Sequence, residues 1–448
     1  MVHEPDREIT PAVTASGAFH ELGTASAMLP ATNWWSGFGD PDLDAFMEEA
    51  LHSNLELQIL VARIEQADAL LRLAGGRLLP QLDAVGDYDA RWADLDDSPT
   101  REEASSVGGL LTWELDVWGR LRAARRAELM ESMATRHDYE GGRLLLSVAV
   151  AETYFEILEQ RLQHRLLNQQ IEANQTLLDL TRLRFGQAQS SIVDVLQQRE
   201  QLDSTLALVP EIESRLEQLE YALDVLLGQA PGTRPRIRHE ALQEPPPLEG
   251  GGVPSSLLEH RPDLVAARDR VVAVDYRVGE AIADRLPRFV IGGSLTAGGT
   301  PGLDTLVGTL FASAVAPVYD AGTRRAEVER RRALLREQIA DFSNLYLGAV
   351  RDVETALLRE RHQKDRVALL SEQLRTAQRL LNETRNRYSQ GLTDYLPVLA
   401  ALTRSQNLER DLLNSRRVWL TDRVAVHRAL GGPLLPDPDP AASREARR

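Results

Sequence analysis

The chain has 448 residues, a length that allows one to three domains and a large core. Its formal net charge of −16 at pH 7 argues against a nucleic-acid partner, because nucleic-acid binders present basic surfaces. With 43% hydrophobic and 26% charged residues the composition is globular, which excludes wholesale disorder. The absence of cysteine excludes disulfides and cysteine-ligated metals.

The sequence lacks the usual signals of a helical membrane protein and of export. No run approaches the ~18 consecutive apolar residues that a membrane-spanning helix needs. The first thirty residues lack a basic start followed by an apolar run. We therefore expect either a cytosolic chain or a chain whose export signal was removed or missed.

An internal duplication spans most of the chain. The string RFGQAQSSIVDVL, beginning at Arg184, matches RYSQGLTDYLPVL, beginning at Arg387, at an offset of 203 residues. Gly119 and Gly322 match at the same offset. The predicted domains are an extended segment 1–33, a first repeat 34–228, a Pro- and Gly-rich linker 229–253, a second repeat 254–432 and a disordered tail 433–448.

Each repeat reads as a helix, two strands, a very long helix and a shorter helix. The first helix begins with Asp40 as its N-cap and runs to Pro80, which stops it. The equivalent proline of the second copy is Pro287, at an offset of 207 residues. The predicted helix–strand junctions are Pro80, Gly119, Pro287 and Gly322.

The long helices, expected over 119–185 and 322–388, carry a coiled-coil pattern. In the second one, apolar residues follow alternating steps of four and three residues from Leu335 onward. At ~1.5 Å per residue each helix is roughly 100 Å long, too long for one compact core. We expect a bundle, in which shorter helices over 191–228 and 394–431 return antiparallel as hairpins.

Four segments between the helices alternate apolar and polar residues, which is typical of strands. They span about 81–93, 105–118, 287–299 and 305–319. Each matches or exceeds the ~9–11 residues of a tilted transmembrane strand. The apolar faces place Tyr88, Trp92, Trp113 and Phe289 where aromatic side chains face lipid at a membrane interface. The alternation is equally compatible with an ordinary amphipathic sheet packed on a helix.

The neighbouring helices favour the membrane interpretation, because they are too long to serve as a compact cover for a sheet. Four strands cannot close a barrel, and an open edge in lipid would leave backbone N–H and C=O groups unpaired. Several copies must therefore complete the wall. Eight strands from a dimer would leave an interior filled by side chains, whereas twelve from a trimer could leave a water-filled bore. A trimeric channel is the simplest closed answer.

Several short strings then point to a known family. They are WW at 34–35 followed by FGDPDL at 38–43, Pro80 and Pro287, WGR at 118–120, and the strings beginning at Arg184 and Arg387. With the duplication, they make residues 34–432 resemble the TolC-like outer-membrane efflux channel family, in particular its OprM/NodT-type branch of RND efflux lipoproteins. The resemblance implies a mainly α fold with a β-barrel part, assembled as a homotrimer with a 12-stranded β-barrel and a 12-helix α-barrel.

The resemblance also implies a function. The family's members are passive exit ducts in the outer membrane of Gram-negative-type bacteria, with a long periplasmic extension, and they need no cofactor. They dock a periplasmic adaptor protein and an inner-membrane RND transporter, and export drug-like or other small molecules. They are not enzymes. Two alternatives stay open: the channel of a type I protein secretion system, and a soluble coiled-coil scaffold or adaptor.

The sequence departs from the family pattern in two ways. Members of this branch carry a signal peptide that ends in a lipidated cysteine, so we expect that the sequence is truncated at its start or that the anchor is absent. Ala188 stands where the first hairpin tip of the family has glycine, whereas Gly391 keeps it in the second. Because glycine adopts positive φ without steric cost, we expect a slightly different turn at the first tip.

By the same resemblance, the hairpin tips dock the adaptor. The residues concerned are Arg184, Phe185, Arg387, Tyr388 and Gly391. The alternative is that they only close the hairpins.

Next to the tips, the family narrows its bore at positions that correspond to Asp194, Asp394, Tyr395 and Leu396. Acidic side chains from several copies around one axis would attract cations and repel anions. The alternative is that the aspartates cap the returning helices.

No motif for metal binding or catalysis is complete. His20 and His239 each lack the second histidine of a HExxH zinc helix. The glycines at 250–252 lack the Lys-Ser/Thr of a phosphate loop, and those at 292–293 do not form a nucleophile elbow. We predict no metal site and no enzymatic activity.

Overall fold

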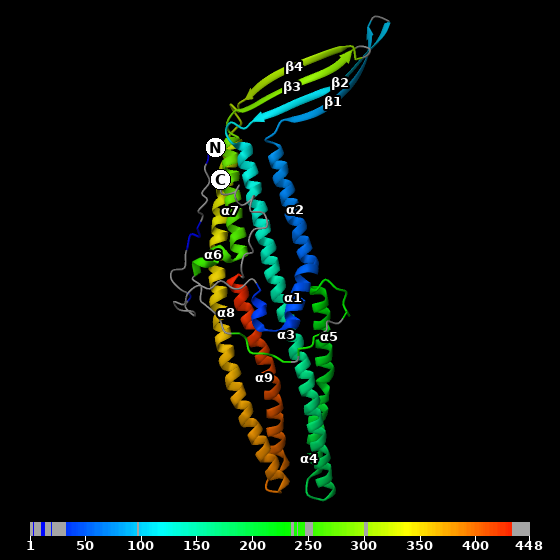
Figure 1. The fold of residues 1–448 in the computed structure, drawn as a ribbon, viewed down its shortest axis with the longest axis vertical. Helices are drawn as coiled ribbons and strands as arrows, with labels where there is room; N and C mark the ends of the chain where they lie inside the picture. The colour runs from blue at the N-terminus through cyan, green and yellow to red at the C-terminus, as the bar shows by residue number, and fades with distance from the viewer. Residues whose placement is uncertain are drawn as a thin grey trace.

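The computed structural model shows an elongated molecule with a β-sheet at one end and the tips of two helical hairpins at the other (Figure 1). It describes residues 3, 10–13, 19, 33–95, 98–233, 237–239, 241–246, 254–299 and 303–431. Most of the predicted segment 1–33, part of the linker 229–253 and the tail 433–448 lie outside the described residues.

The two repeats contain the same order of long elements. The first repeat comprises η1 (Trp34–Phe38), α1 (Pro41–Ser53), α2 (Leu55–Gly76), β1 (Gln81–Leu95), β2 (Ser98–Leu115), α3 (Arg120–Gly186), α4 (Ile192–Ala207) and α5 (Val209–Leu226). The second comprises η2 (Pro254–Ser256), α6 (Leu257–His260), α7 (Pro262–Ala283), β3 (Arg288–Gly299), β4 (Thr305–Val315), α8 (Thr323–Ser389) and α9 (Tyr395–Leu430). The long helices α3 and α8 both have 67 residues.

Two helices of the first repeat are broken where the sequence predicted continuity. The predicted helix from Asp40 to Pro80 is interrupted at Asn54, whose side chain accepts hydrogen bonds from the N–H groups of Glu56 and Leu57 and so begins α2. The predicted helix 191–228 is interrupted at Leu208. Pro210 lies in the first turn of α5 and cannot donate the backbone bond that would join the two pieces.

The strands form one antiparallel sheet in the order β1-β2-β3-β4. The β1–β2 hairpin is longer than predicted, because pairing continues to Leu95 and Ser98, beyond the alternating stretch. β4 ends at Val315, four residues before the predicted end. β1 and β4 are the two edges of the sheet, and neither has a partner strand among the described residues.

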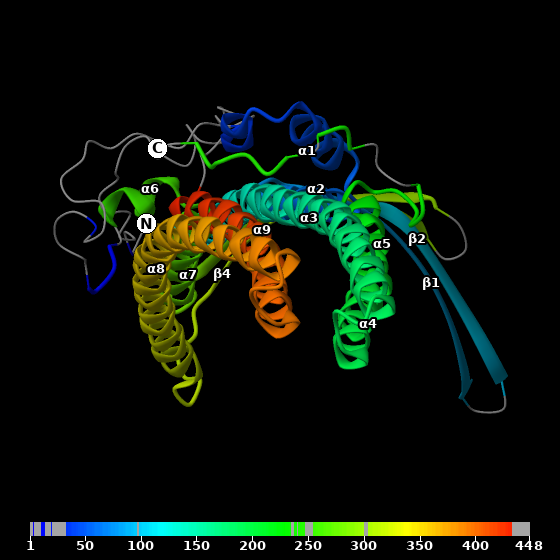
Figure 2. The same cartoon turned by 90° about the horizontal axis from the view of Figure 1, so that it is seen from below.

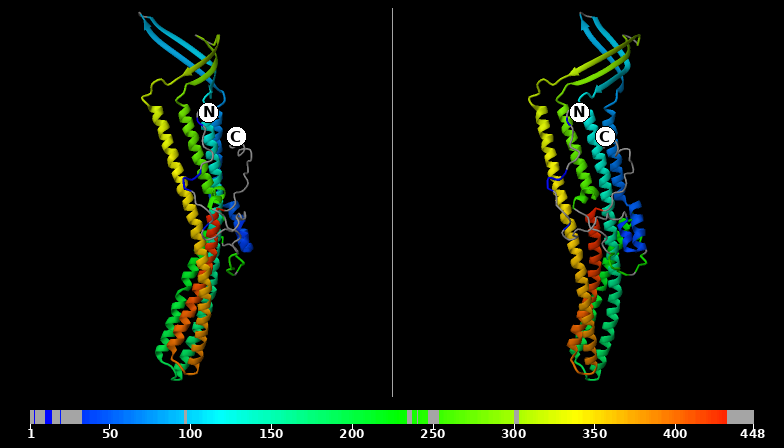
Figure 3. Two further views of the ribbon diagram at one scale, coloured as in Figure 1. Left: turned by 90° about the vertical axis from the view of Figure 1, so that its left-hand side faces the viewer. Right: turned by 60° about the vertical axis from the view of Figure 1, so that its left-hand side comes forward.

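Below the sheet the helices form a curved layer (Figure 2). In the hairpin half, α9 packs between α8 and α3, and α3 packs in turn against α4 and α5. In the half nearer the sheet, α7 packs between α8 and α3, and α2 covers the other side of α3. One edge of the layer is therefore α8, and the opposite edge is α2 with α4 and α5. Figure 3 shows from two further sides that both hairpins end at the same end of the molecule.

The largest hydrophobic core lies midway along the molecule, where η1 and α1 pack on α3, α5 and α9. Its aromatic centre contains Trp34, Phe38 and Tyr154. The hydroxyl of Tyr154 donates a 2.6 Å hydrogen bond to Asp40, which also caps α1. Burial, followed by this bond, raises the pKa of Tyr154 far above its usual value. The FGDPDL string thus joins the first short helices to the long helix α3.

Candidate functional site

The sheet has one apolar face that continues across all four strands. The register pairs Leu82 with Leu111, Leu111 with Gly293, and Gly293 with Leu310, so these residues share a face. Leu82 and Leu310 are 74% and 92% exposed, and all eleven residues of β4 are exposed. The apolar face is therefore open to the surroundings.

The opposite face of the sheet is mainly polar, although Leu110, Val307 and Phe311 also lie on it. Asp87 pairs with Ser106, and the ladder continues through residues such as Thr112, Ser294 and Thr309. Because successive side chains of a strand alternate between faces, none of these shares a face with Leu82 or Leu310. The sheet thus separates an apolar side from a polar side.

The four aromatic residues predicted to face lipid all lie on the apolar face. Tyr88 and Trp92 are 64% and 73% exposed and lie on β1, toward its turn. Trp113 and Phe289 lie at the helix end of β2 and β3, where the indole N–H of Trp113 donates to the carbonyl of Leu78 at 2.9 Å. The aromatic residues therefore form two groups at different heights on one face.

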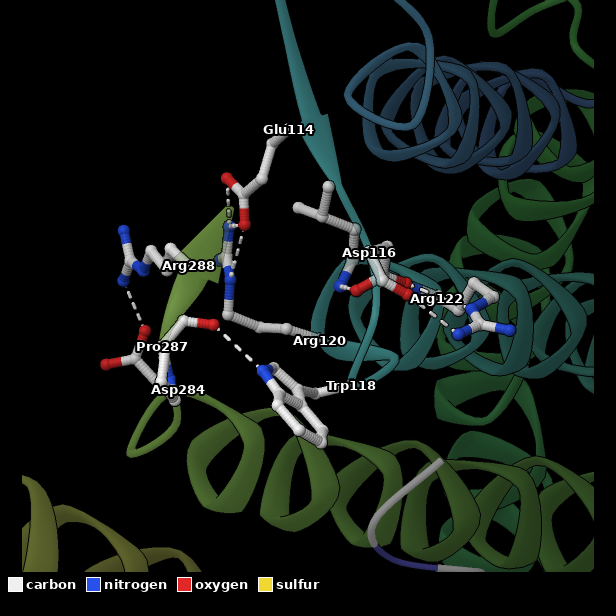
Figure 4. Close-up of polar contacts among 9 residues, drawn as sticks. Glu114, Asp116, Trp118, Arg120, Arg122, Asp284, Pro287 and Arg288 are labelled. Carbon is white, nitrogen blue, oxygen red and sulfur yellow. Dashed lines mark hydrogen bonds and ion pairs between the residues drawn. The ribbon is translucent and has the colours of Figure 1, made fainter. Parts of the chain in front are cut away.

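The junction between β2 and α3 is held by charge and by a left-handed glycine (Figure 4). Gly119 has φ +81° and precedes α3 without a side chain that could cap the helix. The carboxylate of Asp116 takes that role, accepting the N–H groups of Leu121 and Arg122 at 3.0 and 2.9 Å. Arg120 folds back onto Glu114 of β2 with bonds of 2.8 and 2.9 Å.

The two repeats are linked at the same level. The indole N–H of Trp118 donates a 2.8 Å hydrogen bond to the carbonyl of Pro287 (Figure 4). Gly322, with φ +84°, precedes α8 as Gly119 precedes α3. Asp320 accepts the N–H of Arg324, and that bond lowers the pKa of Asp320 below its usual value. The predicted junction residues thus lie where the polypeptide turns from helix to strand or from strand to helix.

At the opposite end of the molecule, the two hairpin tips have the same backbone turn. The N–H of Gln189 donates to the carbonyl of Arg184, and the N–H of Leu392 donates to that of Arg387, both at 2.9 Å. Ala188 has φ +56° and Gly391 has φ +73°. Both tips are therefore Schellman turns. The expectation that alanine changes the first turn is wrong, because Ala188 accepts the left-handed conformation that glycine adopts at the second tip.

Arg184 connects the two tips. Its guanidinium donates to the main-chain carbonyl of Tyr388 at 3.0 Å and lies 4.4 Å from the centre of the Tyr388 ring. Tyr388 is 4% exposed, and burial raises the pKa of its hydroxyl. Their repeat equivalents, Arg387 and Phe185, are both exposed, Phe185 by 45%.

The residues predicted to narrow a bore fall into different settings. Asp194 closes a capping box with Ser191 at the start of α4. Asp394 precedes α9 without a side-chain capping bond, and it is exposed, as is Leu396 at 60%. Tyr395 is only 1% exposed, because it packs on Tyr388 in the seam between the hairpins. Tyr395 therefore faces the seam and not an open surface.

A buried ladder of amides lines this seam, and no local sequence pattern indicates it. Asn174, Gln198 and Gln406 are at most 4% exposed. The amide of Gln406 donates to Asn174 at 3.0 Å, that of Gln198 donates to the carbonyl of Asn174 at 2.8 Å, and the hydroxyl of Tyr395 donates to Gln198. These neutral bonds fix the two hairpins against each other.

A sequence model of the outer membrane efflux protein family matches residues 46–229 and 253–432, most of the chain. The chain belongs to this family. The pyoverdine export outer membrane protein OpmQ of Pseudomonas putida is 31% identical over 425 residues, which cover 90% of this chain and 88% of that protein. Nodulation protein T of Rhizobium leguminosarum is 25% identical over 453 residues, with 99% and 92% covered.

The fold is that of solved channels of the same kind. The open-state MtrE outer membrane channel of Neisseria gonorrhoeae superposes with a TM-score of 0.87 at 22% identity, covering 96% of this chain and 98% of that one. The efflux proteins of this family are outer-membrane ducts, not enzymes, and the protein is an outer-membrane duct of this kind. This membership decides against the soluble scaffold.

Two features are absent from the described residues. None of the helices among them is both long and apolar enough to span a membrane. No group of three or more histidine or acidic side chains in the same ranges is arranged to hold a metal ion.

Proposed function

We propose that three copies of this chain form the outer-membrane exit duct of a tripartite RND-type efflux pump for small molecules. The observation that carries the proposal is the sheet, which has one apolar face, one mainly polar face and two edges without a partner strand among the described residues. In hydrocarbon every backbone polar group needs a partner, so β4 of one copy has to pair with β1 of the next. Four strands from each copy then give a twelve-stranded wall with its polar face toward the bore.

The spacing of the aromatic groups supports this placement. Trp92 pairs with position 101 of β2, and Trp113 lies twelve residues farther along that strand. At ~3.3 Å per residue the two tryptophan levels are about 40 Å apart along the strand, or about 28 Å along the normal of a bilayer at ~45° tilt. That is close to the ~25 Å apolar band between the aromatic girdles of outer-membrane barrels. We assign Tyr88, Trp92, Trp113 and Phe289 to lipid.

The helical half is assigned to the periplasm, where each repeat, 34–228 and 254–432, supplies one hairpin. We propose that the tips, with Arg184, Phe185, Arg387, Tyr388 and Gly391, dock a periplasmic adaptor protein that links the duct to an inner-membrane transporter. Leu392, beside Gly391 at the second tip, is 65% exposed, which supports an interaction surface there. The relative named for pyoverdine export supports a small-molecule cargo over a secreted protein.

For the narrow point of the bore we propose Asp394 and Leu396, which are exposed beside the second tip. Asp194 stands at the equivalent side of the first tip, half-buried in its capping box. Tyr395 contributes indirectly, because it holds α9 against α4 through its bond to Gln198.

Reconstitution tests the duct directly. The purified protein, added to planar lipid bilayers, is expected to produce discrete conductance steps that favour cations, in line with the net charge of −16 per chain. Detergent-solubilised protein that never conducts would contradict a duct. In cells, deletion of the gene is expected to increase intracellular accumulation of small efflux substrates. Loss of a secreted protein, with accumulation unchanged, would favour the type I secretion channel instead.

A further inference from the structure

The seam between the two hairpins of one chain provides a template for a second seam. Within the chain, the α3/α4 hairpin meets α9 of the α8/α9 hairpin. The offset of 203 residues assigns to every residue of this seam an equivalent in the other repeat. The equivalents considered below belong to the α8/α9 hairpin and to the α3/α4 hairpin, which form opposite sides of the helical layer (Figure 2).

The apolar part of the seam has exposed equivalents. Inside the chain, Leu177 packs in one cluster with Tyr388 and Tyr395, and all three are at most 4% exposed. The equivalent residues are Leu380, Phe185 and Ile192, which are 51%, 45% and 49% exposed. Leu380 lies on α8, whereas Phe185 and Ile192 lie at the α3/α4 tip. Each free edge of the chain thus carries one half of the same cluster.

The arginines of the two tips also differ, because one makes contacts within the chain and its equivalent is exposed. Arg184 covers the Tyr388 ring and donates to its carbonyl within the chain. Its equivalent, Arg387, is exposed, and its guanidinium has no ion pair or hydrogen bond with the described part of the chain. The equivalent of Tyr388 is the exposed Phe185. The Arg387 guanidinium is therefore exposed on one edge of the chain. The Phe185 ring, near the last carbonyls of α3, is exposed on the opposite edge.

The polar part of the seam changes in character between the two edges. Inside the chain, Gln201 of α4 accepts the hydroxyl of Thr403 at 3.0 Å and donates to Gln406 at 3.1 Å. The equivalent of Gln201 is Arg404. The equivalents of Thr403 and Gln406 are Glu200 and Asp203, and all three equivalent residues are exposed. A neutral amide contact inside the chain thus corresponds to one arginine and two carboxylates on the free edges.

We infer that a second copy of this chain docks its α3/α4 edge on the α8/α9 edge and repeats the internal seam with ionic contacts. Leu380 and Arg387 meet Phe185 and Ile192 of the neighbour, and Arg404 lies between Glu200 and Asp203 of the neighbour. This assignment names the residues of the interface in the proposed trimeric duct and rests on that proposal. It makes the contact at Arg404 between copies sensitive to salt, whereas the equivalent contact at Gln201 within a copy is neutral.

The absence of cysteine allows a clean cross-linking test. In the full-length protein, Leu380→Cys with Ile192→Cys is expected to give covalent dimers and trimers after treatment with a short bifunctional maleimide in membranes. The matched control is the equivalent pair inside the chain, Leu177→Cys with Tyr395→Cys, which is expected to cross-link without any increase in mass. Single-cysteine variants show the background.

A charge exchange tests the ionic part. Arg404→Glu is expected to lower the fraction of trimer that survives dilution in detergent several-fold. The variant Glu200→Thr, Asp203→Gln, Arg404→Gln copies the neutral contact of the internal seam onto the free edges, so it is expected to form trimers whose stability depends less on salt than that of the unmodified protein. Arg325→Glu, at the exposed ion pair of Arg325 with Glu329 near the sheet end of α8, serves as the control for a change of surface charge, because Arg199 itself pairs with Asp203 of the proposed interface.

The outcomes separate this inference from the proposed function. A trimer by mass in which Leu380→Cys and Ile192→Cys do not cross-link, while the internal control pair does, would overturn the interface and leave the duct standing. A trimer stability that is insensitive to salt in the unmodified protein would overturn the ionic seam. Cross-linked trimers that fail to conduct would contradict the duct, whereas the interface would stand.

Discussion

Arg184 of the first hairpin donates a hydrogen bond to the carbonyl of Tyr388 of the second hairpin and covers its ring at 4.4 Å. The carbonyl lies at the end of α8, where the helix dipole is negative, so the guanidinium is favourably placed. A charge-assisted hydrogen bond contributes ~1.5–3 kcal/mol and a cation–π contact ~0.5–2 kcal/mol. One side chain therefore controls much of the contact between the tips.

Arg184→Ala is expected to loosen the tips locally. A loss of ~2 kcal/mol corresponds to roughly 30-fold faster hydrogen exchange at the amides of the second tip. Arg182→Ala is a matched control two residues away, because Arg182 forms only an exposed pair with Asp179. Exchange that is equally fast in both variants would show that Arg184 does not hold the seam.

We expect the left-handed backbone conformation of Ala188 to lower the stability of the first tip. A non-glycine residue in the left-handed conformation is strained by ~1 kcal/mol, so Ala188→Gly should stabilise the hairpin by about that amount. Gly391→Ala should destabilise the second tip to a similar extent, since no atom lies within 4 Å of the added Cβ and strain is the main term. Thermal unfolding of both variants measures the two changes in stability. A change in the same direction in both variants would contradict this account.

Substitutions of Asp394 and Asp194 should distinguish a residue that narrows the bore from a residue that caps a helix. Asp394 makes no capping bond, so Asp394→Ala should leave the stability of α9 nearly unchanged while it raises leak conductance and lowers the preference for cations. Asp194→Ala breaks a capping box and should cost ~1 kcal/mol. Bilayer conductance and unfolding are measured on both. An unchanged conductance in Asp394→Ala and Leu396→Ala would remove both residues from the gate.

His427 should make the core sensitive to acid. It is buried and stacks on Trp34 at 5.2 Å, and burial followed by the charge of Arg423 lowers the pKa of His427 to about 4. Since that pKa is below the unfolded value of ~6.5, stability is complete above pH ~6.5 and falls as the pH drops toward 4. The shift corresponds to roughly 3 kcal/mol.

The variant His427→Gln should abolish this part of the acid sensitivity. We expect the melting temperature of the unmodified protein to fall more steeply between pH 7 and pH 4.5 than that of the variant. His52→Gln is the control, because His52 is an exposed residue in the last turn of α1. Parallel curves for all three proteins would show that His427 titrates normally.

Glu360 and Arg423 form a buried ion pair that should be sensitive to the removal of one partner. Both side chains are at most 8% exposed, and Arg423 also donates to the carbonyl of Pro246 in the linker. Glu360→Ala leaves a buried guanidinium without its carboxylate and should cost ~3–5 kcal/mol. Chemical denaturation measures the loss. A cost below ~1 kcal/mol would mean that water compensates the arginine.

The long helices, the strands and the two tips could be predicted because each leaves a short-range period in the sequence. The break at Leu208 could also have been predicted, since Pro210 removes a helical hydrogen bond whatever the tertiary context. The break at Asn54 could not, because asparagine is tolerated in helices and only its bond to the carbonyl of Leu226 shows why it caps here.

The amide ladder had no signature of its own. Asn174 and Gln406 are separated by 232 residues, and neutral polar residues on a long helix are usually solvated. The resemblance to the family predicts Tyr395 beside a bore, yet its side chain lies in the seam, where it bonds Gln198 and packs on Tyr388. Which residues of the tips meet depends on how the repeats dock, and no local pattern encodes that.

The outer edges of β1 and β4, which have no partner strand among the described residues, also bear on biogenesis. Before it assembles with other copies, a newly exported chain exposes the N–H and C=O groups of two strand edges beside an exposed apolar surface. This combination favours edge-to-edge aggregation. The barrel portion therefore depends on a chaperone or on rapid delivery to lipid, and overproduction of the protein without either should yield aggregates that originate in the strands.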